Sequence, residues 1–275
     1  MKRLCLAATC VALLAAAAPA SANHSWGGYH WARTTTSTTT TFTIGLGDNV
    51  GQAWGQYLGV LSSDWSFAAS GLDPVLNENF ANPVRTQTFT GGIDPKKCRP
   101  QSGKIEVCAA SYGRNGWLGL ASIWASGSHI TQATTKLNDS YFGIGSSYNT
   151  PAWRQMVSCQ EVGHDFGLDH QDEVFANTNL GTCMDYTNQP GGGTQGGSNE
   201  HPNTHDYGEL SHIYAHNDGS TTIAAVPAPS VPASSGSGLR KVRDDLYVED
   251  LGNGNRRFVW VLWSQQVPHG PPADA

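Results

Sequence analysis

The sequence has little charge and no cluster of basic residues. Of 275 residues, 16 are Lys or Arg and 22 are Asp or Glu, which gives a formal net charge of −6. The basic side chains are dispersed along the chain. Proteins that bind nucleic acids neutralise phosphates with clustered Lys and Arg, so we expect no nucleic-acid partner.

Long hydrophobic runs are also missing, except at the start of the chain. Lys2 and Arg3 precede an apolar run from Leu4 to Ala18, and small residues follow up to Ala22. The run is shorter than the roughly 20 residues that cross a bilayer. A membrane anchor is the alternative, but the pattern is typical of a secretory signal peptide at 1–22, cleaved near Ala22. We therefore expect a secreted, extracellular protein that does not span a membrane.

Free cysteines are not expected in the exported chain. Two of the six cysteines lie in the leader, which leaves four: Cys98, Cys108, Cys159 and Cys183. Four cysteines permit three pairings. Cys98 and Cys108 flank a short loop, so we expect them to bond to each other and Cys159 to bond to Cys183. The alternative makes Cys159 a metal ligand or a nucleophile, but an even count in an oxidising compartment favours disulfides.

Composition divides the exported chain into three parts. The ranges are a main domain at 23–217, a Pro/Ser/Gly linker at 218–239 and a short segment at 240–275. In the main domain we expect a strand at 33–47, a hairpin formed by 117–125 and 129–138, a helix that opens at Thr150 and Pro151, and a last helix at 204–216. The final segment has a Gly-Asn-Gly turn between apolar runs, which predicts a small β appendage.

The stretch SCQEVGHDFGLDHQD, residues 158–172, carries the candidate chemistry. On a helix, Gln160 and His164 lie on one face, and Glu161 is rotated slightly away from it. Gly167 can take a positive φ, end the helix and turn the chain so that His170 returns to the same point. This spacing predicts a metal site with His164, His170 and Gln160 as ligands and Glu161 beside a metal-bound water. The alternative is two ordinary polar histidines near a helix end.

The sequence GTCMDY follows at 181–186, and the two stretches together resemble the metzincin superfamily of zinc endopeptidases. The motif of that family is H-E-x-x-H-x-x-G-x-x-H, followed by a turn that contains methionine. The matching residues are Glu161, His164, Gly167, His170 and Met184, and Gln160 is the departure. The resemblance implies one catalytic zinc ion, with Met184 as a hydrophobic floor beneath it. It also implies that Tyr186, as in astacin-like members, is a movable ligand and oxyanion stabiliser; a packed aromatic is the alternative.

The resemblance covers about residues 23–217 and implies an α+β fold. Its parts are a twisted mixed sheet, an active-site helix, a Met-turn and a C-terminal helix. The stretch GWLGLASIW resembles the edge strand to which a peptide or protein substrate adds in extended form. No stretch resembles the His- and Asp-containing loop that holds a second, structural zinc in matrixins, and calcium binding is left open.

Gln160 leaves three outcomes open, because an amide oxygen is a weaker zinc ligand than an imidazole. In the first, Gln160 or a substitute completes the site, and the chain is a monomeric zinc endopeptidase with Glu161 as general base and then proton donor. In the second, Asp169, His201 or His205 completes it. In the third, metal is lost and the domain is a catalytically inactive binding protein.

Overall fold

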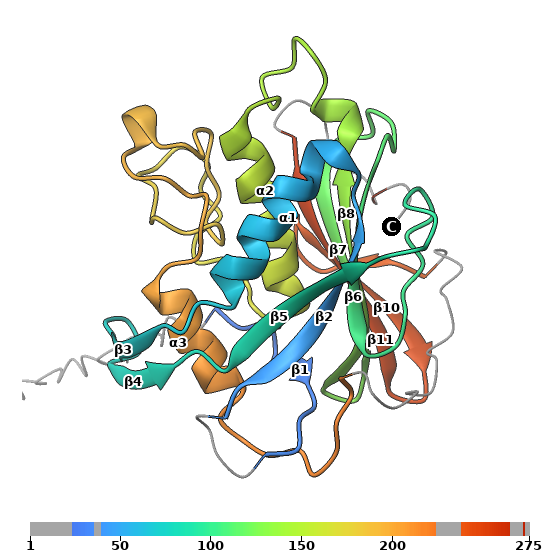
Figure 1. Cartoon of the computed structure of the whole chain (residues 1–275), viewed down its shortest axis with the longest axis vertical. Coiled ribbons are helices and arrows are strands. Elements are labelled where there is room, and N and C mark those ends of the chain that lie inside the picture. Colours follow the sequence, from blue (N-terminus) through green and yellow to red (C-terminus); the bar gives the residue numbers. More distant parts are fainter. Residues whose placement is uncertain (1–23, 36–39, 224–237, 265–271, 273–275) are drawn as a thin grey trace, which may run out of the picture.

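The computed structural model describes residues 24–35, 40–223, 238–264 and 272, and these residues form one large mixed sheet with helices on one face (Figure 1). The expected signal peptide at 1–22 and positions 224–237 of the expected linker lie outside the described residues. Within them, no helix has the length and apolar character needed to cross a membrane.

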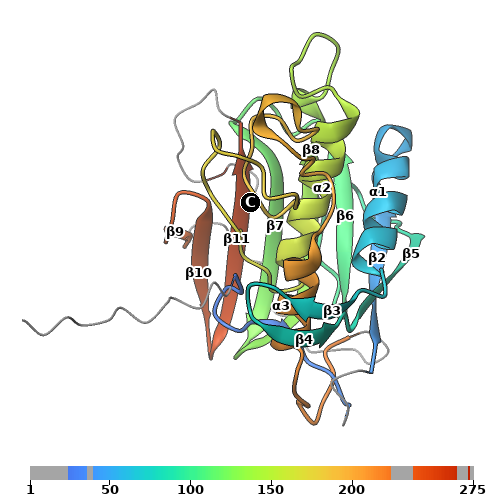
Figure 2. The same ribbon diagram turned by 90° about the vertical axis from the view of Figure 1, so that its left-hand side faces the viewer.

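Eight strands of the sheet follow one another in space, and a ninth lies beside them. The spatial order is β5 (Val84–Thr90), β2 (Phe42–Asn49), β6 (Lys104–Ala110), β8 (His129–Asn138), β7 (Trp117–Ser126), β11 (Asn255–Trp263), β10 (Leu246–Gly252) and β9 (Arg240–Lys241), and β1 (His30–Trp31) pairs with β8. From β5 to β8 the neighbours are parallel, and from β8 to β9 they are antiparallel. Figure 2 shows this succession across the molecule. The expected hairpin at 117–125 and 129–138 is confirmed, whereas the strand expected at 33–47 begins only at Phe42.

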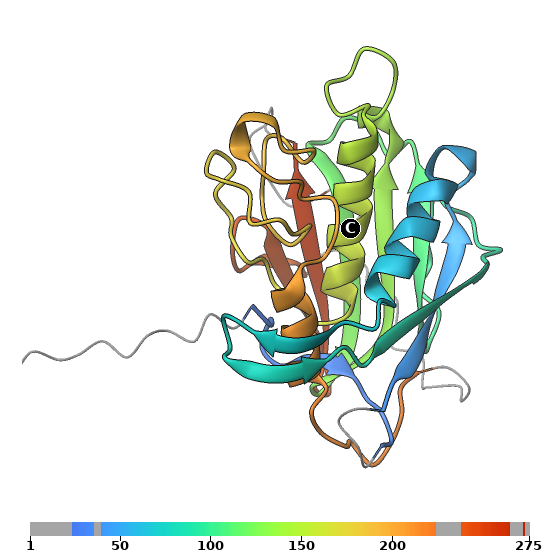
Figure 3. The same ribbon diagram turned by 60° about the vertical axis from the view of Figure 1, so that its left-hand side comes forward.

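Helices α1 (Gln52–Trp65) and α2 (Pro151–Asp165) lie side by side across one face of the sheet (Figure 3). Helix α2 begins where the sequence predicts, because the Thr150 side chain accepts a hydrogen bond from the backbone N–H of Trp153 and Pro151 takes the first position. Helix α3 (Thr204–Ile213) packs against a small hairpin of β3 (Ser70–Asp73) and β4 (Glu78–Ala81). Two short 3-10 helices, η1 (Asp139–Tyr141) and η2 (Gly193–Gln195), complete the elements.

Strand β11 is buried on both of its faces. Phe258, Trp260 and Leu262 belong to the main core between sheet and helices. The alternate residues, Val259, Val261 and Trp263, belong to a smaller cluster on the opposite face. A run of apolar residues on a strand removes most apolar surface from water when both faces of the strand are covered, as they are inside a large sheet.

Two expectations for the C-terminal half of the sheet are therefore wrong. The sequence predicts a small appendage at 240–275, but the described strands of this segment extend the main sheet, since β11 pairs with β7 from Asn255 opposite Ser126 to Trp263 opposite Trp117. Strand β7, expected as a free edge for substrate, lies between β8 and β11 and is hydrogen-bonded on both sides. The continuous apolar run of β11 explains both differences, because it cannot remain exposed on a small hairpin.

Candidate metal centre

The chain reverses direction at Gly167, immediately after α2. Gly167 has φ +105°, and its N–H donates to the carbonyl of His164 at 3.0 Å. A Cβ at this position would lie 2.3 Å from the carbonyl oxygen of Tyr29, so both the backbone conformation and the space require glycine. The turn brings the Leu168 carbonyl to within 2.8 Å of Nδ1 of His164.

His164 and His170 face each other through their Nε2 atoms, which lie 3.0 Å apart. Both rings are buried, and their planes are nearly perpendicular at 88°. Nδ1 of His164 donates to the Leu168 carbonyl, and Nδ1 of His170 lies 3.0 Å from a carboxylate oxygen of Asp245. With a proton on each Nδ1, both neutral rings present an Nε2 lone pair, and two lone pairs at this distance need a cation or a shared proton between them.

The surroundings of His164 keep its ring neutral. Burial lowers its pKa well below the usual value, and the neighbouring His170 lowers it further, although the Leu168 carbonyl acts in the opposite direction. A neutral imidazole is the form that binds a metal.

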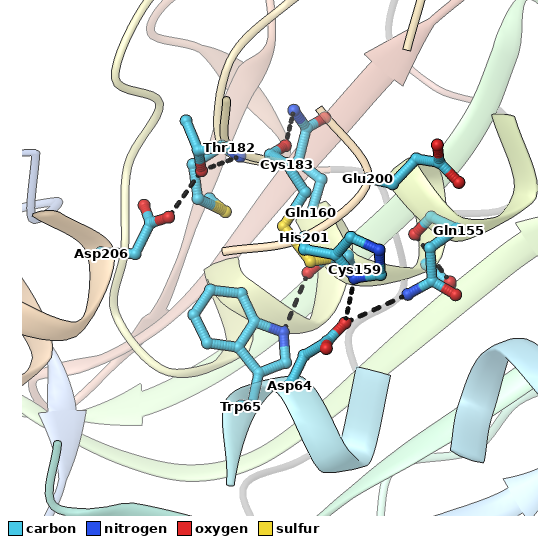
Figure 4. Close-up of a disulfide and its surroundings, with 12 residues drawn as sticks. Asp64, Trp65, Gln155, Cys159, Gln160, Thr182, Cys183, Glu200, His201 and Asp206 are labelled. Carbon is cyan, nitrogen blue, oxygen red and sulfur yellow. Dashed lines mark hydrogen bonds and ion pairs between the residues drawn. A yellow bond between two sulfur atoms is a disulfide. The ribbon is translucent and has the colours of Figure 1, made fainter. Parts of the chain in front are cut away.

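Gln160 presents an unsatisfied oxygen inside this region. Its side-chain Nε2 donates to the Cys183 carbonyl at 2.8 Å (Figure 4). Its Oε1 is buried and has no hydrogen-bond partner. Such an atom costs about 1–3 kcal/mol, and a bound cation would satisfy it. Two imidazole nitrogens and an unsatisfied amide oxygen are donor types that a zinc ion accepts.

Glu161 is fully buried under the β7–β11 pair. A Cβ on Gly119 of β7 would lie 2.6 Å from its Oε1, so the strand passes directly over the carboxyl group. Burial raises the pKa of Glu161 well above its usual value, and the charge of Asp165 adds to this. The backbone N–H groups of Leu262 and Ala121 partly offset the shift, although neither carboxyl oxygen makes a hydrogen bond of good geometry.

The turn that contains Met184 is bonded covalently to α2. Among the described residues there are two disulfides, Cys98–Cys108 and Cys159–Cys183, and Figure 4 shows the second. Met184 is fully buried, and its sulfur lies so close to Gly163 that a Cβ there would be 2.5 Å away. The methionine thus packs against the residue that precedes His164.

Tyr186 is buried beside His170, with 4.3 Å between the ring centroids. Its hydroxyl donates to Asp245 at 3.2 Å. Burial raises the pKa of Tyr186 well above its usual value, and the charges of Asp245 and Glu161 raise it further. The phenol is therefore protonated and able to donate.

Three residues of the C-terminal segment cover this site, and the sequence motif gave no sign of them. The Trp260 ring stacks on His164 with 4.4 Å between centroids and 7° between planes. Arg243 lies 4.8 Å from the centre of the Trp260 ring. Burial opposes the charged form of Asp245, but the hydrogen bond from His170 and the charge of Arg243 hold the pKa of Asp245 well below its usual value.

Two of the three substitute ligands considered from the sequence lie elsewhere, whereas Asp169 lies beside His170. Its Oδ1 is 3.9 Å from Nδ1 of His170, and Asp169, His170 and Glu173 have ligand atoms within 4.8 Å of one another. Both carboxylate oxygens of Asp169 accept from Arg243, at 2.9 and 2.6 Å. His201 is exposed and lies 2.8 Å from Asp64 (Figure 4). His205 lies 2.9 Å from Asp73.

Comparisons with known proteins give one distant similarity. No family model matches the sequence, and no curated protein matches it. Among solved structures, the chain is similar to high choriolytic enzyme 1, a hatching enzyme zinc-protease from the medaka fish Oryzias latipes. The identity is 9%, the alignment covers 69% of this chain and 96% of that chain, and the TM-score is 0.37.

Proposed function

We propose that the protein is a secreted zinc-dependent endopeptidase whose site is covered, in this conformation, by its own C-terminal hairpin. The observation that carries the proposal is the convergence of the His164 and His170 Nε2 atoms at 3.0 Å. Behind the rings, Nδ1 of His164 donates to the Leu168 carbonyl, and Nδ1 of His170 lies 3.0 Å from an oxygen of Asp245. Acceptors behind the ring fix the tautomer and orientation of histidines that bind metals.

Gln160 would supply the third protein ligand through its unsatisfied oxygen, and Met184 would close the site from below. A zinc ion, when bound, supplies a Lewis acid that polarises a carbonyl and lowers the pKa of a coordinated water to about 7.

Glu161 would act as general base and then as general acid. It would accept a proton from the attacking water and deliver it to the departing amine. Burial raises the pKa of Glu161 well above its usual value, which favours the protonated form that delivers a proton to the amine. The protonated Tyr186 would donate to the developing oxyanion once it leaves Asp245.

The hairpin of β10 and β11 accounts for the absence of an open substrate edge on β7. A peptide that adds to β7 as a strand needs the backbone groups that β11 occupies from Trp263 to Asn255. Trp260 and Asp245 also contact the two histidines directly. Substrate entry therefore requires that the hairpin move away from β7.

The test is cleavage of a labelled, unfolded protein by the full chain, with zinc content measured in the same samples. Glu161→Gln is expected to keep zinc and to lower the cleavage rate by a factor of about 100 or more. Trp260→Ala, which uncovers His164, is expected to cleave faster than the natural chain. Cleavage by Glu161→Gln at the rate of the natural chain would remove Glu161 from its proposed role.

A catalytically inactive binding protein is the second candidate, and two observations favour it. The Gln160 amide is held by the Cys183 carbonyl, and β11 occupies the edge of β7. This candidate predicts that His164→Ala leaves zinc content unchanged, and that neither the natural chain nor Trp260→Ala cleaves the labelled protein.

A further inference from the structure

Four further metal-ligating residues meet at one end of the sheet, outside the site described above. His30 lies in β1, His129 is the first residue of β8, and His216 and Asp218 follow α3. The parallel pairing of β1 with β8 places His30 directly beside His129. Figure 1 shows the segment after α3, in orange, running beside the first described residues, in blue, at the lower end of the molecule.

The ligand atoms of His30, His129 and Asp218 all lie within 4.8 Å of one another, and His216 approaches His30 and Asp218. Oδ1 of Asp218 lies 3.1 Å from Nε2 of His30, 3.2 Å from Nε2 of His129 and 3.1 Å from Nε2 of His216. The Nε2 atoms of His30 and His216 lie 3.0 Å apart. Ligands at 2.0–2.1 Å from a tetrahedral zinc are separated by roughly 3.3 Å, so these distances are close to those of a coordination shell.

Hydrogen bonding alone leaves the contact between Nε2 of His30 and Oδ1 of Asp218 unsatisfied. Nδ1 of His30 lies 2.7 Å from the Gly28 carbonyl, so it carries a proton and donates. A second proton on Nε2, needed to reach Asp218, would charge a buried ring and point toward Nε2 of His216. A divalent cation satisfies the three nitrogens and the oxygen together, with His30 in its neutral form.

The backbone holds the carboxylate of Asp218 in place from behind. Its Oδ2 accepts from the Arg33 N–H at 2.9 Å, and its own N–H donates to the Arg33 carbonyl at 3.1 Å. Four residues further on, Thr222 and Ala32 exchange a similar pair of bonds. Oδ1 is thereby left to face the three imidazoles, and such oriented ligands are typical of metal sites.

We propose that His30, His129, His216 and Asp218 form a structural zinc site. Imidazoles and a carboxylate are suitable zinc ligands, and His30, His129 and Asp218 already lie within 4.8 Å of one another. His216 would complete the set of four by moving closer to His129, and four protein ligands leave no position for a reacting water. His30 and Asp218 are buried, whereas His129 and His216 are partly exposed, so the ion can enter from solvent. None of the four belongs to the motif around His164, and the proposal does not depend on the proposed function.

The ion would join the two ends of the main domain. Trp31, next to His30, donates through Nε1 to the Asp165 carbonyl, and Trp26 donates to the His164 carbonyl. The segment that carries His30 therefore packs under the end of α2. Zinc at the new site would fix this segment to the chain that leaves α3, and we expect it to stabilise the fold.

The first test is zinc stoichiometry by mass spectrometry of the full chain after metal removal and reloading with zinc. His129→Ala/His216→Ala is expected to bind one zinc fewer per chain than the natural protein. His212→Ala is the matched control, because His212 is an exposed histidine of the same region that pairs with Glu78. The control is expected to keep the natural stoichiometry. Equal zinc content in the double variant and the natural protein would overturn the proposal.

The second test separates the new site from the site at His164. His164→Ala/His170→Ala removes the two motif histidines but leaves the four new ligands intact. Zinc at 100 times its Kd is expected to raise the melting temperature of this variant by roughly 5 to 10 °C. Adding His129→Ala and His216→Ala is expected to abolish that shift, and a shift that persists would contradict the assignment. If the background variant does not fold, the shift is compared between the natural protein and Asp218→Asn, where a smaller shift is expected and an equal one overturns the site.

Discussion

At the scale of single residues, small changes in side-chain chemistry decide what the candidate site can bind. Gly167 is required by both its positive φ and the nearby Tyr29 carbonyl, so the turn that returns His170 could be predicted from the sequence. The hydrogen bonding of the Gln160 side chain could not be predicted, because its bond to the Cys183 carbonyl joins residues 23 positions apart. The helix pattern predicts which face Gln160 lies on and says nothing about its partner.

Gln160→His is expected to raise zinc affinity at this site by about tenfold or more, equivalent to about 1.4 kcal/mol. The change replaces an uncharged amide oxygen by a better zinc ligand. The measurement is competition with a chelator of known affinity, in the His129→Ala/His216→Ala background so that one site is observed. Unchanged affinity would show that position 160 does not face the metal.

The buried carboxyl group of Glu106 is expected to make the stability of the fold depend on pH. It is fully buried in β6, and its Oε2 accepts from the Asn49 side chain at 2.7 Å. Burial raises the pKa of Glu106, and the Asn49 hydrogen bond and the Lys104 charge only partly offset this. A carboxyl group with a raised pKa in the folded state opposes folding when it ionises, so the penalty develops as pH rises above the unfolded value of about 4.3.

Glu106→Gln is therefore expected to be more stable than the natural chain at pH 7, with the difference vanishing below about pH 4. Urea unfolding of both proteins at the two pH values measures this difference in the free energy of unfolding. A variant that is less stable at pH 7 would indicate that the carboxylate is compensated in the fold.

At the scale of elements, the start of α2 and the β7–β8 hairpin follow from local patterns, and the place of β11 does not. Thr150 and Pro151 mark a helix start, and two β-rich runs around a Ser-Gly-Ser turn mark a hairpin. The apolar run of β11 predicts a buried strand, but it does not select β7 as the partner. The four-residue zinc site was missed for a similar reason, since His30 and His216 are 186 positions apart.

Trp260→Ala tests whether the hairpin covers the histidines. Loss of a buried tryptophan is expected to cost about 3–5 kcal/mol of stability. It is also expected to increase the rate at which a histidine-specific reagent modifies His164, measured by peptide mass spectrometry. Trp263→Ala is the matched control, because Trp263 lies in the same strand but packs in the cluster on the opposite face of the sheet. Equal modification rates in the two variants would contradict a covering role for Trp260.

At the scale of the whole molecule, one sheet unites the main domain and the C-terminal segment. The β7–β11 pairing runs along the full strand, and both faces of β11 are buried. The hairpin therefore has no core of its own. We expect a single cooperative unfolding transition, with coincident midpoints by far-ultraviolet circular dichroism and by tryptophan fluorescence. Two separated transitions would mean that the hairpin folds independently.

The pairing of β11 with β7 also determines where the chain can be shortened. A fragment that stops at residue 217, the boundary suggested by the motif and the linker, would lose β11 and leave β7 with a row of unpaired backbone groups. Trp117 and Leu120 would be exposed beside that row. Bare, apolar strand edges join one another, so such a fragment would self-associate and precipitate. Soluble recombinant material requires a chain that extends at least through Trp263.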